Sequence, residues 1–228
     1  MSDEHTHGND DNKGLQILDS VYKRVLEGIP HVSEPVEDMV RDYIAKNPDA
    51  KSAASSMINY QIAKCTTSGF VTGFGGAVTL PVTIPANVGS VLYIQMRMIA
   101  ACAMMGGYDL HSDQVQTMIY ACLVGLKVSS IVKQCGIKLG VKIAQAGIKK
   151  IPGKILTKIN QKIGFRFITK FGSKGLINLG KLIPIVGALI SGGFDFASTR
   201  AVGKRAYHVF LEGDFDQGDE EIVLEDES

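Results

Sequence analysis

The sequence predicts an all-α protein: a multi-helix bundle with a central apolar helical hairpin broken by glycine and proline, and a basic amphipathic C-terminal half. Hydrophobic residues make up 45% of the 228 residues and recur at the spacing of amphipathic helices. The stretch from Cys65 to Met96 carries no charged residue. A chain of this length and hydrophobicity can bury one large core. We therefore expect one domain at residues 13–211 between two disordered acidic tails, 1–12 and 212–228.

Three helices are predicted before the apolar stretch. The first runs from about residue 13 to 27 and ends at Ile29-Pro30, because proline disfavours a helical conformation in the residue before it. Ser33 is expected to cap the second, which reaches about Lys46. The third runs from residue 50 to about 66.

The apolar stretch itself is too rich in glycine and proline to form one straight helix. Pro81 and Pro85 predict a turn between a short apolar helix and a long helix from about Pro85 to Gly106. Both prolines interrupt the run, and Arg97 follows it, so no part is an uninterrupted membrane span. A hairpin that re-enters the membrane, or one buried in the protein, fits better.

The C-terminal half begins with a helix predicted from Asp113, with Gln116 placed as in a capping box, to about Gln134. Basic residues then recur every four positions. On one ideal helix each step of four residues rotates about 40° beyond a full turn, so these residues would not stay on one face. Two or three short amphipathic helices, broken at Pro152-Gly153, Gly164 and Gly172, are therefore expected. The basic residues of this register are Lys150, Lys154, Lys158, Lys162, Arg166, Lys170 and Lys174.

A last helix is predicted over residues 195–211. The tail after it carries nine acidic residues and no basic one. Besides disorder, this composition allows the tail to fold back on the basic half and mask it.

The charge distribution points to an anionic partner. The formal charge is only +1, but no acidic residue occurs between Gln114 and Phe194, whereas thirteen lysines and arginines do. The uncharged apolar runs fit anionic lipid better than nucleic acid. The polar, acidic N-terminus does not resemble a signal peptide, and the four cysteines form no CxxC pair. We expect a protein of the cytoplasm or of the cytosolic face of a membrane, with reduced cysteines.

No catalytic, metal-binding or cofactor-binding motif emerges. Residues 175–181 match GxxxxGK, but Leu182 follows where a phosphate-binding loop has serine or threonine. Two charges stand isolated among apolar residues, Arg97 and Asp195. Because buried charges are normally paired, we expect Asp195 to pair with Arg97 or Arg200, as a structural lock or as part of a functional polar site.

Several short motifs occur in order along the chain: Leu80-Pro81-Val82-Thr83-Ile84-Pro85-Ala86, Gln95-Met96-Arg97-Met98-Ile99, Gly107-Tyr108-Asp109, Ile151-Pro152-Gly153-Lys154, Lys158-Ile159-Asn160, Gly164-Phe165-Arg166, Thr169-Lys170-Phe171-Gly172, Asn178 through Pro184, Gly193-Phe194-Asp195 and Ser198-Thr199-Arg200. With these motifs, residues 15–210 resemble the EcsC family of bacterial proteins. The resemblance implies an all-helical fold and a role at membranes, including that of a membrane-directed effector. It implies no particular reaction.

The sequence thus predicts a non-enzymatic protein that docks on anionic membrane surfaces through Lys150–Lys174, with entry of the Pro81–Pro85 hairpin as a second step. One alternative is an adaptor or regulator of a membrane transporter, such as an ABC transporter, whose apolar surface binds protein. Another is an enzyme with a lipid-accessible polar site around Asp195 and Arg97, including Asp109 or His111.

Overall fold

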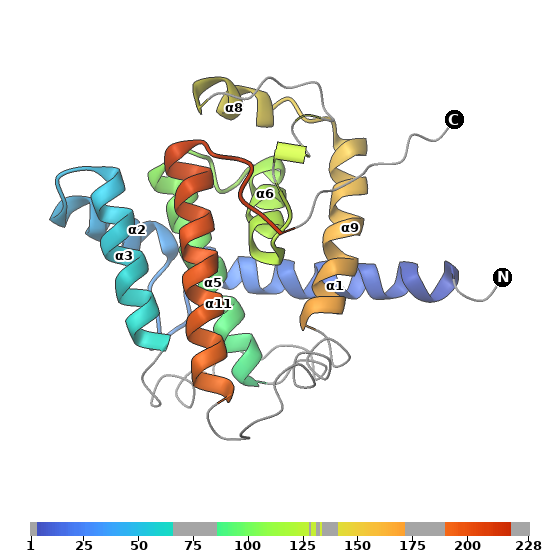
Figure 1. The fold of residues 1–228 in the computed structure, drawn as a ribbon, viewed down its shortest axis with the longest axis horizontal. Coiled ribbons are helices and arrows are strands. Elements are labelled where there is room, and N and C mark those ends of the chain that lie inside the picture. The colour runs from blue at the N-terminus through green and yellow to red at the C-terminus, as the bar shows by residue number, and fades with distance from the viewer. Residues whose placement is uncertain are drawn as a thin grey trace.

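The protein is all-α, as predicted (Figure 1). The computed structural model describes residues 4–65, 86–127, 129–130, 133, 141–171 and 190–219. No strand occurs within these ranges, which contain one isolated β-bridge between Ile29 and Ser33. The helices are α1 (Glu4–Glu27), α2 (Val36–Lys46), α3 (Ala50–Cys65), α5 (Ala86–Met105), α6 (Asp113–Val124), α8 (Val141–Ile148), α9 (Gly153–Phe171) and α11 (Ile190–Tyr207), which continues into the π-helical turn η1 (His208–Glu212).

Helix α5 lies at the centre of the bundle and contacts α1, α2, α3, α6 and α11. Every residue from Leu92 to Ala103 is buried, which explains why this part of the helix is apolar on all sides except at Gln95 and Arg97. It begins at Ala86, directly after Pro85, as the sequence predicted. The first arm and the turn at Pro81 and Pro85 lie outside the described residues.

Two polar residues of α5 connect it to its neighbours. The Gln95 side-chain amide donates to Ser198 Oγ at 3.1 Å and to Thr199 Oγ1 at 3.2 Å, which joins α5 to α11. Arg97 instead reaches toward the loop before α2. Ser33 in this loop was predicted to cap α2, but the N-cap residue is Pro35. Ser33 instead shares a 2.6 Å hydrogen bond with the Tyr93 hydroxyl.

The boundaries of two helices differ from the predictions. Helix α1 begins at Glu4, within the predicted tail 1–12. Helix α6 begins at Asp113 as expected but ends at Val124 rather than near Gln134. Gly125 ends it because its φ of 85° lies in the left-handed region, which glycine adopts without strain.

Helix α9 is continuous through Gly164, so the prediction of a break there was wrong. Gly164 is buried where α9 crosses α1, and a Cβ atom on Gly14 of α1 would lie 2.5 Å from the Gly164 carbonyl oxygen. The two glycines therefore allow the two backbones to approach closely. Figure 1 shows α9 crossing α1 near the middle of α1.

Residues 213–219, which we call the C-terminal strap, pack on the domain beyond the predicted boundary at residue 211. Phe215 is only 2% exposed, and its carbonyl accepts a 2.7 Å hydrogen bond from the Ser129 amide. The Asp219 amide donates to the Gly125 carbonyl at 2.8 Å. The strap thus covers the C-terminal end of α6.

Among the described residues, no helix combines the length and the apolar character required to cross a bilayer.

Candidate functional site

The basic register predicted over residues 150–174 divides into two sets. Lys150, Lys154 and Lys162 are exposed, and Lys158 is partly buried. Lys174 lies outside the described residues. The apolar residues that follow them along the helix, including Ile159 and Ile163, are buried against α1 and α6. The apolar side of α9 therefore belongs to the protein core.

The second set, Arg166 and Lys170, turns inward. Arg166 Nε donates to the Val124 carbonyl at 2.9 Å and Lys170 Nζ to the same oxygen at 3.2 Å. Arg205 of α11 joins them and donates to the Cys122 carbonyl at 3.1 Å. The three cations occupy the C-terminal end of α6, where unpaired carbonyls carry partial negative charge.

Lys170 is the most perturbed member of this cluster. Burial lowers its pKa to about 8, and the positive charges of Arg205 and Arg166 act in the same direction. The strap supplies the opposing charge, because Asp219 Oδ2 lies 3.1 Å from Arg205 Nη2. Asp216 of the strap also lies 3.7 Å from Lys133 Nζ. The start of the acidic tail thus contacts two basic residues, whereas residues 220–228 lie outside the described residues, so masking of the basic half by the tail stays a prediction.

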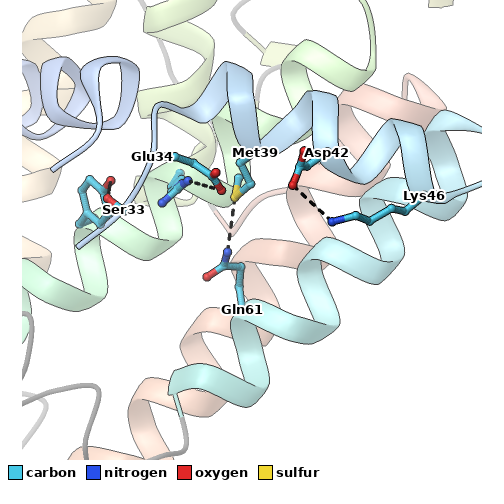
Figure 2. A network of polar contacts seen from close by, with 8 residues as sticks. Ser33, Glu34, Met39, Asp42, Lys46 and Gln61 are labelled. Atoms are coloured by element: carbon cyan, nitrogen blue, oxygen red, sulfur yellow. Dashed lines mark hydrogen bonds and ion pairs between the residues drawn. The ribbon is translucent and has the colours of Figure 1, made fainter. Parts of the chain in front are cut away.

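A second polar region is a groove lined by α2, α3, α5 and the loop before α2, with a volume of about 570 Å³. We call it the Arg97 groove. Figure 2 shows Glu34, Met39, Asp42 and Lys46 along α2 and the preceding loop, facing Gln61 of α3. The groove is lined by Val32, Ser33, Glu34, Met39, Asp42, Tyr43, Lys46, Tyr60, Gln61, Lys64, Tyr93, Ile94 and Arg97.

Arg97 is the buried charge of this groove, with 9% of its side chain exposed. Its Nη2 lies 3.6 Å from Glu34 Oε1, and half of the Glu34 side chain is exposed. Among the described residues, the Arg97 Nε–H has no hydrogen-bond partner. The Asp195 side chain lies outside the described residues, so its pairing with Arg97 or Arg200 stays a prediction. Arg200 is exposed on α11 and lines a different depression.

Two lysines of the groove contact neighbouring side chains. Lys46 Nζ donates to Asp42 Oδ2 at 3.3 Å, and Lys64 Nζ lies 4.7 Å from the centre of the Tyr60 ring. Burial raises the pKa of the Tyr43 hydroxyl. The groove therefore offers cations and aromatic rings together.

Other residues considered from the sequence lie elsewhere. His111 Nε2 is 3.3 Å from Glu37 Oε1 on an exposed surface, and neither His111 nor Asp109 lines the Arg97 groove. Cys102 and Cys122 are free and fully buried, and burial raises the pKa of the Cys122 thiol to about 12. Within the described residues, no three histidine, cysteine or acidic residues lie close enough to hold a metal ion.

The sequence pattern of the EcsC protein family matches residues 47–211. The chain belongs to the EcsC protein family. Neither the curated proteins nor the solved structures include a match to it. In this EcsC protein the family region contains all of α9 and the α3 and α5 walls of the Arg97 groove. The α2 wall and the strap lie outside it.

Several residues of these sites were not identified from the sequence. Glu34 was not singled out from the sequence, although it is the partner of Arg97 in the EcsC protein. Lys46 and Lys64 stand near helix ends, where basic residues are common for reasons of helix stability. Their position on the same groove depends on how α2 and α3 pack, which local sequence does not reveal.

Proposed function

We propose that this EcsC protein is a non-catalytic, peripheral membrane protein that docks on anionic lipid surfaces. The contact surface is the junction of α8 and α9, with Lys149, Lys150 and Lys154 as its central residues. These three lysines are exposed, and no ion pair of theirs occurs among the described residues.

The position of the lysines supports this proposal. Lys154 lies in the first turn of α9, which contains no acidic residue. A positive charge there is unfavourable for the helix dipole, so acidic residues would serve helix stability better. The segment between Gln114 and Phe194 likewise offers no carboxylate to neutralise them. An anionic surface would supply the missing negative charge.

Burial of the apolar side of α9 supports a contact made by charge. Ile159, Ile163 and Phe167 are fully buried, so α9 cannot place them in lipid without leaving the core. We therefore propose capture by lysine side chains, each worth about 1 kcal/mol near an anionic membrane. Entry of the hairpin at Pro81 and Pro85 remains the second step of the proposal.

Flotation with phosphatidylcholine vesicles, with and without phosphatidylserine, tests this proposal. We expect the wild-type protein to float only with the anionic vesicles. The variant K149Q/K150Q/K154Q should bind about 100-fold more weakly, because three contributions of about 1 kcal/mol are lost. Binding should also weaken at high salt, which screens exposed charges.

A matched control removes the same number of charges elsewhere. Lys23, Arg41 and Lys51 are exposed on α1, α2 and α3, and the ion pairs of Lys23 and Arg41 are surface pairs of little energetic value. The variant K23Q/R41Q/K51Q should float like the wild type. Equal loss of binding in both triple variants would contradict a contact localised at α8 and α9. Lipid-independent capture by a membrane transporter would favour the adaptor alternative.

A further inference from the structure

The Arg97 groove contains a buried cation that the membrane contact does not use. We propose that this groove binds a phosphate-bearing ligand, with the Arg97 guanidinium as its principal contact and Glu34 as an internal competitor for that contact. The inference goes beyond the proposed docking and does not depend on it.

The first argument is the incomplete pairing of Arg97. A guanidinium carries five N–H donors, and buried donors are normally hydrogen-bonded. The Arg97 Nε–H has no partner within the described part of the chain, and the 3.6 Å separation of Nη2 from Glu34 exceeds a hydrogen-bond distance. A permanent structural ion pair would be expected to have closer, two-point geometry. Arg97 therefore retains donors for an oxyanion.

The second argument is that Glu34 can leave. Half of its side chain is exposed, so its carboxylate can turn into water without a change in the helices. A phosphate that replaced it would offer more acceptor oxygens in an arrangement that matches the guanidinium fork. Glu34 thus neutralises Arg97 in the structure and competes with an incoming anion.

The third argument is the remainder of the groove. Lys64 and Lys46, which is paired with Asp42, line it together with Arg97. The three cations and the carboxylates of Asp42 and Glu34 give the groove a net charge of +1, which becomes +2 when Glu34 turns away. Its volume of about 570 Å³ is larger than a phosphate group needs and falls in the range of small-molecule sites. The rings of Tyr43, Tyr60 and Tyr93 line the groove as well. This combination fits a phosphate monoester with an organic portion, either a soluble compound or a lipid headgroup.

Calorimetric titration of the full-length protein with inorganic phosphate and with glycerol 3-phosphate tests the inference without any membrane. We expect millimolar or tighter binding by the wild type, and loss of at least about tenfold in affinity for R97Q. The informative variant is E34Q, which changes a half-exposed side chain and removes the competitor. It should bind both probes several-fold more tightly than the wild type.

Glu37, in the first turn of α2 and three residues after Glu34, provides a matched control. It pairs with His111 and does not line the groove, so E37Q removes the same charge without freeing Arg97. Tighter binding by E34Q but not by E37Q supports the inference, even if R97Q fails to fold. Equal affinity of E34Q, E37Q and the wild type, or no binding by any of them, would overturn it.

Two further measurements separate the ligand sources and the two proposals. Preference of E34Q for phosphatidic acid vesicles over phosphatidylserine vesicles of equal charge indicates a lipid headgroup, whereas binding of glycerol 3-phosphate without this preference indicates a soluble phosphate. The K149Q/K150Q/K154Q variant should bind glycerol 3-phosphate with unchanged affinity. If the protein fails to dock on vesicles, binding of glycerol 3-phosphate in the Arg97 groove can still be observed. If the groove binds no phosphate, docking through the lysines can still be observed.

Discussion

The crossing of α1 and α9 makes a quantitative prediction for the substitution Gly14→Ala. The added Cβ would lie 2.5 Å from the Gly164 carbonyl oxygen and 3.1 Å from the Gly164 carbonyl carbon and Cα. All of these atoms are backbone, so no side chain can rotate away. Relief requires the two helices to separate where they now touch.

The energetic balance has two opposing terms. Overpacking of a well-packed contact costs about 1–3 kcal/mol, and rigid backbone on both sides favours the upper end. Alanine gains about 1 kcal/mol over glycine within a helix. The free energy of unfolding should therefore fall by about 2 kcal/mol, which lowers the melting temperature by about 4–8 °C for a chain of this length.

Urea denaturation and a thermal melt of Gly14→Ala measure this effect, with Gly153→Ala as the control. Gly153 begins α9, and a Cβ there would have no neighbour within 4 Å. The control should be unchanged or more stable by about 0.5 kcal/mol. If Gly14→Ala were as stable as Gly153→Ala, the two helices would not be held together by a glycine contact.

Three other substitutions test the cation cluster, the α1–α6 contact and the strap. Because burial lowers the pKa of Lys170 to about 8, the unfolded chain binds more protons between about pH 8 and 10.5. The free energy of unfolding of the wild type, measured in urea at several pH values, should therefore rise across this window by at most about 3 kcal/mol relative to that of Lys170→Met. Parallel pH profiles of the two proteins would contradict this. Tyr120→Phe removes a hydroxyl that donates to Asp19 at 2.8 Å, so the free energy of unfolding should fall by about 1–2 kcal/mol, and no change would show that the bond contributes nothing net. Phe215→Ala should lower the free energy of unfolding by about 3–4 kcal/mol, because the buried ring is lost. It should also make the chain after residue 212 sensitive to protease, and unchanged proteolysis would contradict anchoring of the strap.

The helices with regular apolar spacing were predictable from the sequence. Ile17, Val21 and Val25 recur every four residues, and all three are buried on α1. Proline also gave correct boundaries, because α5 begins directly after Pro85. These signals are local, so they do not depend on what each helix contacts.

Glycine was the main source of error, because its structural role depends on residues far away in the chain. Gly125 ends α6 inside an apolar run, whereas Gly164 lies within α9 and serves the contact with Gly14. The sequence distinguishes neither case. The four-residue register had a similar limit: its drift around the helix was predicted, but not that Arg166 and Lys170 would reach α6.

The candidate site was predictable only in part. Arg97 was identified as an isolated charge in an apolar run, which agrees with its burial. Its contact with Glu34 joins a helix to a distant loop, and no periodic pattern records such a pair. The rest of the groove follows from the packing of α2 and α3 against α5.

The burial of Cys102 and Cys122 gives the molecule internal reporters of its own opening. A thiol reacts as its thiolate, so side chains that are fully buried and have raised pKa values are labelled only when α5 and α6 separate. With Cys65 and Cys135 exchanged for serine, these two are the only thiols left in the chain. Their labelling rate would stay slow for a protein that lies intact on a vesicle. It would rise if binding pulled the central helix out of its bundle, so the same pair can time the step from adsorption to insertion.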